Sequence, residues 1–189
     1  MRVLDLFSGI GGFSLGLERA GFETVAFCEI EDYPRKVLAK HWPGVPIYDD
    51  VRTLTAERLA ADGITGIDVI TGGFPCQDIS VAGKGDGLDG ERSGLWSEMA
   101  RIIGEVQPRF AFVENSPMLT SRGLDRVLGD LSALGYDAEW GVVGADDAGA
   151  PHRRERIWIL AYATGEGTGP DNGGLRAWSC GIGGGERTG

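Results

Sequence analysis

The sequence predicts an α/β fold, in which a mostly parallel sheet carries helices on both faces. Through residue 163, short apolar segments typical of strands alternate with segments of helical periodicity. Segment 124–135 shows that periodicity most clearly, because its apolar residues at 124, 127, 128, 131 and 134 fall on one helical face. The length of 189 residues suits one well-buried domain and is short for two.

Seven apolar segments predict the strands of this sheet. They are short and rich in aliphatic and aromatic side chains, a composition that favours strands. In chain order they span residues 2–7, 23–29, 45–50, 67–74, 109–114, 138–143 and 156–163. The last two flank loop 144–155 with no helix between them.

Five segments predict helices, and Gly or Pro marks several of their ends. Helix 13–20 stops at Gly21, and helix 33–42 has a proline near its start and Pro43-Gly44 after it. Helix 95–106 ends just before Pro108. The other two span residues 56–62, a weak helix, and residues 124–135.

Two stretches fall outside this alternation. Residues 73–93 have the composition of a loop, and a loop of that length suggests a function. From Thr164 on, the chain is glycine-rich, aperiodic and too poor in apolar residues for a core. We therefore expect a domain at residues 1–163, followed at 164–189 by a tail that is a linker or the start of a further region.

Composition narrows the class of protein. No apolar run approaches the ~18 residues of a membrane-spanning helix, and the start lacks the pattern of a secretory signal, so a cytoplasmic location is expected. Three cysteines without close spacing and two distant histidines indicate no metal site. The net charge of −10 argues against general nucleic-acid binding, although residues 152–156 form a strongly basic cluster.

The segment "DLFSGIGG" follows the first strand and opens the first helix. Its glycines allow a ligand to approach the backbone and leave free amides at a helix N-terminus. About 20 residues on, Glu29 ends the second strand, where an acidic residue can accept bonds from both hydroxyls of a ribose. Asp50, after the third strand, is placed to meet the exocyclic amine of a purine. The alternatives are a turn that merely needs glycine and a solvated turn aspartate.

A second group of polar residues follows later strands. Cys76, directly after Pro75, lies just beyond the carboxyl end of strand 67–74, the edge where ligands bind in open α/β sheets. Glu114 ends the neighbouring strand and can act there as an acid or a hydrogen-bond donor. Arg154 and Arg156 alternate, so both point to one side of an extended segment. A capped or ion-paired carboxylate and a solvated charged turn are the alternatives.

Together these segments resemble one family, the cytosine-5 DNA methyltransferases. "DLFSGIGGF" is similar to its cofactor loop, "GGFPCQDIS" to its nucleophile loop, "FVENS" to its Glu-Asn motif and "PHRRER" to its Arg-x-Arg motif, in family order. The resemblance covers about residues 1–163. It implies the Rossmann-like fold of class I methyltransferases, S-adenosyl-L-methionine as cofactor, double-stranded DNA as partner, no membrane contact, and a cytoplasmic prokaryotic or phage-type enzyme, as in restriction-modification systems.

The resemblance also assigns a cofactor pocket. Glu29 is expected on the ribose and Asp50 near the adenine, flanked by Ile30 and Val51, while Pro75 and Leu95 help to close the site. The full set of expected cofactor-binding residues is Phe7, Ser8, Gly9, Gly11, Gly12, Glu29, Ile30, Asp50, Val51, Pro75 and Leu95.

The catalytic residues follow from the same resemblance. Cys76 is expected to add to C6 of cytosine, which makes C5 nucleophilic enough to take a methyl group. Glu114 would bond N3 and the amino group, and Arg154 and Arg156 would bind the base and brace Glu114. Asn115 and Gln77 would support the substrate and the nucleophile loop. The base must leave the duplex for C6 to be reached.

Three departures from the family pattern accompany these matches. His152 stands where the family usually has Gln, and Ser116 where it has Val. The larger departure is that family members continue into a target-recognition region and a returning C-terminal segment. The chain is therefore expected to be a catalytic part, a fragment or one subunit of a split enzyme. A non-catalytic cofactor- or DNA-binding module and an RNA methyltransferase are the alternatives.

Overall fold

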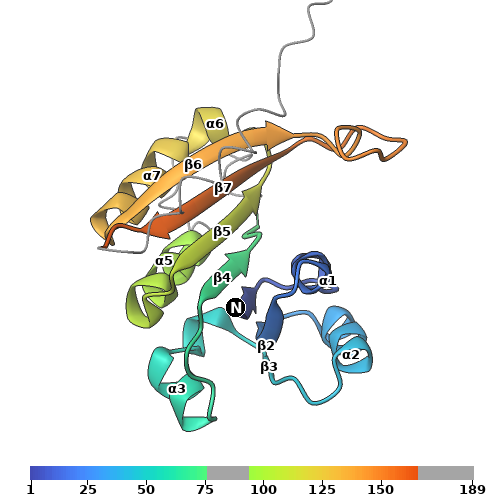
Figure 1. Ribbon diagram of the computed structural model, residues 1–189, viewed down its shortest axis with the longest axis vertical. Helices are drawn as coiled ribbons and strands as arrows, with labels where there is room; N and C mark the ends of the chain where they lie inside the picture. The colour runs from blue at the N-terminus through green and yellow to red at the C-terminus, as the bar shows by residue number, and fades with distance from the viewer. Residues whose placement is uncertain (76–93, 166–189) are drawn as a thin grey trace, which may run out of the picture.

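A computed structural model describes residues 1–75 and 94–165 of the chain. Within them, one seven-stranded sheet has the strand order β3-β2-β1-β4-β5-β7-β6 (Figure 1). Strands β1 to β5 pair in parallel, whereas β7 runs antiparallel to both β5 and β6. The strands are β1 (Arg2–Leu6), β2 (Glu23–Cys28), β3 (Ile47–Tyr48), β4 (Val69–Gly72), β5 (Phe110–Asn115), β6 (Tyr136–Val143) and β7 (Arg156–Ala163).

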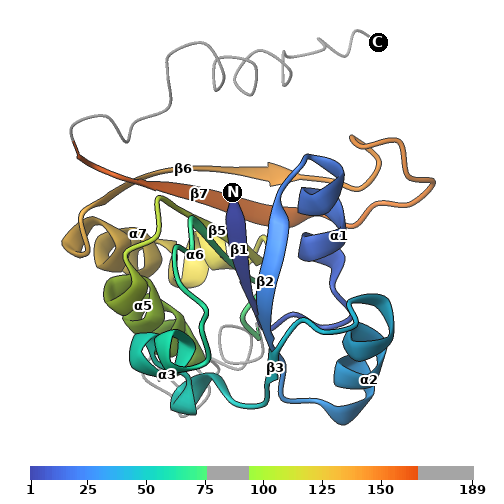
Figure 2. The ribbon, with the colours of Figure 1, turned by 60° about the horizontal axis from the view of Figure 1, so that its bottom comes forward.

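Helices cover both faces of the sheet. Figure 2 shows α3, α5 and α7 on one side and α1 and α2 on the other. The helices are α1 (Gly12–Arg19), α2 (Asp32–His41), the 3-10 helix η1 (Val51–Thr53), α3 (Ala56–Ala61), α5 (Gly94–Val106), α6 (Leu119–Arg122) and α7 (Leu124–Ala133). The predicted α/β fold with a mostly parallel sheet is confirmed.

Differences from the sequence prediction are confined to short elements and ends. Neither η1 nor α6 is predicted, because three or four residues are too few to show helical periodicity. The third strand shrinks to two residues, since only Ile47 and Tyr48 pair with β2. Strand β6 begins at Tyr136, two residues earlier than predicted, and the Tyr136 hydroxyl donates to the carbonyl of Pro108.

The main core lies between the sheet and the α5–α7 layer. Alternate residues of β5 and β7 are fully buried on that side, among them Val113 and Ile159, and they belong to one apolar cluster with Ile102 of α5 and Leu131 of α7. Strand β1 is buried from Val3 to Leu6, as expected for a central strand covered on both faces.

The opposite face of the sheet is held by α1. Phe13 makes edge-to-face contacts with Phe112 and Trp158, with ring centroids 5.5 Å apart in both pairs. Two other apolar side chains of this region, Ile10 and Leu15, remain 61% and 47% exposed. The first helix therefore presents apolar surface on two sides, of which the described residues cover one.

The predicted boundary at residue 163 coincides with the end of β7. Thr164 continues the backbone pairing, because its amide and its hydroxyl both donate to the carbonyl of Gly135. The rest of the predicted tail, residues 166–189, lies outside the described residues. The division of the chain into a domain and a tail remains a prediction.

A buried carboxyl group ties α1 to the centre of the sheet. Asp5 of β1 is fully buried and accepts hydrogen bonds from Ser14 of α1 and Thr71 of β4, at 2.9 and 2.7 Å. Burial raises the pKa of Asp5 to about 7, against the lowering effect of the two hydroxyl donors, and the charge of Glu29 adds to the rise. The carboxyl is thus half-protonated near neutral pH in the folded chain.

The raised pKa of Asp5 predicts a pH-dependent stability. Because the folded pKa of about 7 exceeds the ordinary aspartate value of 3.8, this group stabilises the fold below pH 3.8 and loses that contribution as the pH rises through 7. Asp5→Asn keeps the shape without titrating, so it should flatten the decline of melting temperature across this window. Scanning calorimetry at several pH values measures this decline in both the unmodified chain and the variant. An unchanged slope would remove Asp5 as its source.

Candidate active site

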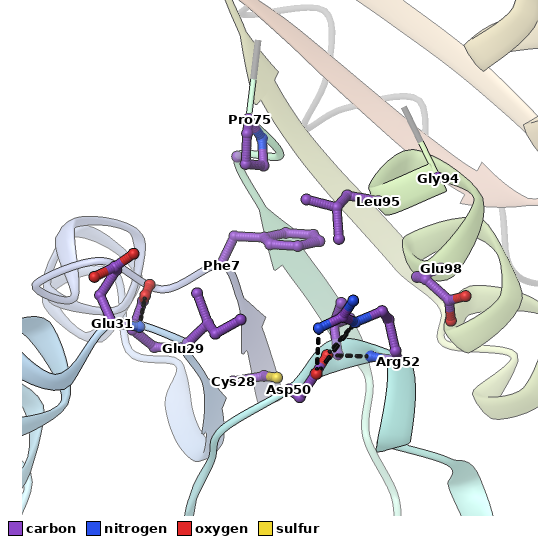
Figure 3. Close-up of a pocket in the computed structure, with 13 residues that line it drawn as sticks. Phe7, Cys28, Glu29, Glu31, Asp50, Arg52, Pro75, Gly94, Leu95 and Glu98 are labelled. Atoms are coloured by element: carbon purple, nitrogen blue, oxygen red, sulfur yellow. Dashed lines mark hydrogen bonds and ion pairs between the residues drawn. The ribbon is translucent and has the colours of Figure 1, made fainter. Parts of the chain in front are cut away.

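The carboxyl ends of β1, β2 and β4 converge on one pocket of about 550 Å³. This volume lies within the ordinary range for small-molecule sites, and the position is the expected one for an open parallel sheet. Apolar side chains of Phe7, Pro75 and Leu95 gather on one side of it (Figure 3). The pocket is lined by Phe7, Cys28, Glu29, Ile30, Glu31, Asp50, Val51, Arg52, Gly73, Pro75, Gly94, Leu95 and Glu98.

The loop between β1 and α1 folds tightly beneath this pocket. Phe7, Gly9 and Gly11 have φ angles of 51°, 52° and 88°, in the left-handed region that favours glycine. Gly11 also has no room for a side chain, since an added Cβ would lie 2.5 Å from the ring of Trp42. Backbone conformation therefore favours glycine at positions 9 and 11, and close packing requires it at Gly11, whereas neither reason applies to Gly12.

The Ser8 side chain faces the strands. Its hydroxyl donates to the carbonyl of Asp5 at 2.6 Å and bonds the backbone of Cys28, and the residue is buried. Ser8 thus clamps the end of β1 to the end of β2. It is absent from the pocket lining, as are Gly9, Gly11 and Gly12.

Glu29 fixes the loop through its side chain. One carboxylate oxygen accepts the amide of Gly9 at 2.7 Å, and the other accepts the amide of Glu31 at 2.8 Å. Each carboxylate oxygen has a further lone pair, so Glu29 can still accept bonds from a ligand. The residue both lines the pocket and holds the loop that borders it.

Asp50 is engaged by a neighbouring cation. Arg52 bonds it with its backbone amide and with two guanidinium nitrogens, the shortest at 2.7 Å. The hydrogen bond from the Arg52 side chain holds the pKa of Asp50 below its usual range. Among the described residues that line the pocket, Arg52 is the one cation against four carboxylates. This part of the lining is acidic and favours a cationic or hydroxyl-rich ligand.

Cys28 also lines the pocket, but its thiol is not poised for attack. Burial raises its pKa to about 12, and the charges of Asp50 and Glu29 contribute further. A buried protonated thiol is chemically inert. Desolvation and the nearby carboxylates thus both raise the pKa of Cys28.

Alkylation tests this assignment. At pH 8 a thiol of pKa about 12 is ionised in only about one molecule in ten thousand. In the folded chain, iodoacetamide should therefore leave Cys28 unmodified, and in denaturant it should modify the same residue readily. Peptide mass spectrometry after timed quenching gives the answer. Rapid labelling of native Cys28 would contradict the raised pKa.

The segment entering the predicted nucleophile loop is held by Asn115. Its side-chain amide donates to the carbonyl of Phe74 at 3.0 Å, and its oxygen accepts the amide of Ser116. The Phe74 ring packs 5.4 Å from that of Trp96 on α5. Asn115 therefore fixes the backbone immediately before Pro75. Cys76 and Gln77 lie outside the described residues.

Glu114 and Arg156 form an ion pair beside this segment, with Nε and Oε1 2.6 Å apart. Their side chains remain 24% and 29% exposed, which leaves polar atoms accessible at the sheet edge. Gly73 lies directly alongside, since a Cβ there would approach the second oxygen of Glu114 to 2.6 Å. A carboxylate, a guanidinium and the chain leading to Cys76 thus meet at one place.

The remaining basic residues of the motif lie apart from this pair. Arg154 is exposed and makes no hydrogen bond or ion pair within residues 1–75 and 94–165. Arg153 pairs with Asp146 across the β6–β7 loop, with 3.4 Å between Nε and Oδ2. Of the two arginines singled out in the sequence, Arg156 contacts Glu114 and Arg154 does not.

Seven of the eleven expected cofactor residues line the pocket, namely Phe7, Glu29, Ile30, Asp50, Val51, Pro75 and Leu95. The prediction misses six lining residues, Cys28, Glu31, Arg52, Gly73, Gly94 and Glu98. Glu31 and Arg52 directly follow the expected residues Ile30 and Val51, so their positions in the sequence could have indicated that they line the pocket. Nothing in the sequence indicated Glu98, because it lies within a helix and outside the recognised motifs.

Within residues 1–75 and 94–165 the structure offers neither a metal site nor a membrane-spanning helix. They contain no group of three His, Cys, Asp or Glu side chains that could hold a metal ion. None of their helices is both long and apolar enough to cross a membrane.

Comparison with known proteins decides the family. A family model for C-5 cytosine-specific DNA methylases matches residues 1–172. The chain belongs to this family. The matched span includes Glu114, Asn115, Arg154 and Arg156.

Similar individual proteins are also methyltransferases by name. A type II methyltransferase of Bacillus subtilis is 37% identical over 169 residues, which cover 85% of this chain and 42% of that protein. One from Haemophilus parahaemolyticus is 34% identical over 166 residues, or 86% of this chain and 49% of that protein. The chain thus spans less than half the length of either relative.

Solved structures show the same fold. A protein from an E. coli prophage, named as a DNA modification methyltransferase, matches with a TM-score of 0.73 and 31% identity over 86% of this chain and 47% of that one. The Dnmt2 methyltransferase of S. pombe matches with a TM-score of 0.70 at 22% identity, over 88% and 50% of the two chains, a likeness of fold alone. The Rossmann-like class I methyltransferase fold is confirmed.

Proposed function

We propose that this chain is the catalytic part of a DNA cytosine-5 methyltransferase, which transfers a methyl group from S-adenosylmethionine to C5 of cytosine. The observation that carries the proposal is the Glu114–Arg156 pair beside Gly73. It places a carboxylate next to the backbone that leads into Pro75-Cys76, beside Gly73, which lines the pocket as Pro75 does. Family membership supports the same reaction.

The chain's own residues supply covalent catalysis. The Cys76 thiolate adds to C6 of cytosine, and the electron pair displaced from the C5–C6 bond makes C5 nucleophilic. S-adenosylmethionine would supply the electrophilic methyl group, with cleavage of its methyl–sulfur bond and release of S-adenosylhomocysteine. Glu114 hydrogen-bonds N3 and the amino group and draws electrons from the ring as the thiolate adds. Loss of the C5 proton then expels the thiolate and restores the free enzyme.

Arginines and Asn115 position these groups. Arg156 braces Glu114 through their ion pair, and Asn115 fixes the chain before the nucleophile through the Phe74 carbonyl. Arg154, which is exposed just before β7, contacts the substrate. Gln77 supports the substrate from the nucleophile loop.

The pocket fits S-adenosylmethionine by its chemistry. Glu29 accepts bonds from the ribose hydroxyls, and Asp50 meets the adenine amine, with Ile30 and Val51 flanking the ring. The acidic lining suits a cofactor that carries a sulfonium charge. Ser8, Gly9, Gly11 and Gly12 contribute indirectly, because they shape the loop beneath the pocket.

Double-stranded DNA is the proposed substrate, and the target cytosine is flipped out of the stack. Target recognition comes from a segment or second chain beyond the residues described. Exposed Ile10 and Leu15 support this, since apolar surface of this kind marks an interaction site. A net charge of −10 gives no general attraction to phosphates.

Covalent trapping tests the nucleophile. Duplex DNA that carries 5-fluorocytosine should form a denaturant-resistant adduct when S-adenosylmethionine and a target-recognition segment are supplied, because fluorine blocks loss from C5. Cys76→Ser should form none. Cys180→Ser, outside the residues that match the family, is the matched control and should still trap DNA. An adduct with the Cys76 variant would refute the assignment.

Cofactor binding is tested at Glu29. Glu29→Ala removes acceptors for the ribose and for the Gly9 amide, so affinity for S-adenosylmethionine should fall by ~1.5–3 kcal/mol, the scale of hydrogen bonds to a charged group. Titration calorimetry measures the loss. Glu23→Gln, exposed at the start of β2, controls for charge. Equal affinities for the Ala variant and the unmodified chain would exclude Glu29 from the site.

A further inference from the structure

One arginine of α5 reaches across to the short helix η1 that borders the pocket. The Nη2 atom of Arg101 donates to the carbonyls of Val51 and Leu54, at 3.0 and 2.9 Å. These carbonyls lie at the first residue of η1 and at the residue just after it. A single guanidinium therefore spans the whole turn.

Two carboxylates on α5 hold that guanidinium in place. Glu98 accepts Nε of Arg101 at 2.8 Å, and Glu105 accepts Nη1 at 2.6 Å. The second oxygen of Glu105 accepts the amide of Ala56, at the start of α3. The network thus fixes both η1 and the beginning of the next helix against α5.

The turn held in this way needs such an anchor. A 3-10 helix of three residues has few bonds of its own, and short helices depend on tertiary contacts. Its buried apolar anchors, Val51 and Leu54, fix its depth in the core. The hydrogen bonds from Arg101 also fix the orientation of η1, because a hydrogen bond to a carbonyl depends on its angle.

This turn forms one wall of the pocket. Val51 and Arg52 of η1 line it, together with the preceding Asp50, and so does Glu98, the carboxylate that Arg101 bonds. Two of these four lining residues are held by Arg101 itself, and the other two adjoin Val51 in the chain. Arg101 is not among the lining residues and acts from behind them.

We propose that Arg101 is a positioning residue for the cofactor, which sets the adenine-side wall of the pocket through Val51, Leu54 and Glu98. The inference rests on the proposed function, since it takes this pocket as the S-adenosylmethionine site. Lysine cannot replace Arg101: a compact ammonium lacks the planar fork that bonds two carbonyls and two carboxylates together.

The test compares Arg101→Lys and Arg101→Gln with the unmodified full-length chain. Binding of S-adenosylmethionine and of S-adenosylhomocysteine is measured by titration calorimetry, well below the melting temperature. Both ligands share the adenosine, so both should bind about tenfold more weakly, as expected for loss of one strong hydrogen bond. In a preparation that methylates DNA, KM for the cofactor should rise while kcat at saturation stays unchanged.

The matched control is Arg126→Lys, which alters an i,i+4 ion pair with Asp130 on α7. It should leave both affinities unchanged. Altered melting temperature with unaltered affinity in the Arg101 variants would overturn the inference, as would equal weakening by Arg126→Lys. Loss of the native circular dichroism spectrum in both Arg101 variants would show a folding role instead. No binding by the unmodified chain would defeat the proposed function, and the inference with it.

Discussion

The site depends on how the loop after β1 is held between two strands. Its left-handed residues turn the chain sharply enough for Gly11 to lie against Trp42. Ser8 then binds the ends of β1 and β2, and Glu29 binds the amide of Gly9 from the opposite side. Without these bonds the backbone amides at the start of α1 would have no fixed relation to the pocket. The same groups therefore serve the fold and the site.

Acidic groups take different states within a small region. Asp5, buried with two hydroxyl donors, has a pKa near neutrality, whereas Asp50 stays ionised because Arg52 bonds it. Cys28 stays protonated between them because it is desolvated and faces carboxylates. The position of each group relative to solvent and cations thus decides its charge. A pocket that Asp50 lines in its ionised form follows from this separation.

Sequence patterns predicted the layers of the fold and seven of the residues that line the pocket, because strands and motifs leave local signals. Phe7, Glu29 and Pro75 follow strand ends, and strand ends meet at one edge of a parallel sheet. The direction in which a side chain points cannot be read from such local patterns in the sequence. Ser8 belongs to the segment predicted to bind the cofactor, yet its hydroxyl bonds strand backbone. Glu98 reaches the pocket from a helix. The Arg101 bonds join residues about fifty positions apart, a pairing that periodicity cannot show.

The direction of β7 has a topological consequence. Had β7 run parallel to β5, its first residue would lie at the opposite edge of the sheet, near Phe110 and about 13 Å from Glu114 by the rise of four residues. Because β7 is antiparallel, the residue that begins it arrives beside the residues that end β5. The hairpin from β6 thus delivers Arg156 to an edge built from strand ends. Since cross-strand register fixes that meeting, loop 144–155 can change in length or sequence while the pairing of Arg156 with Glu114 persists.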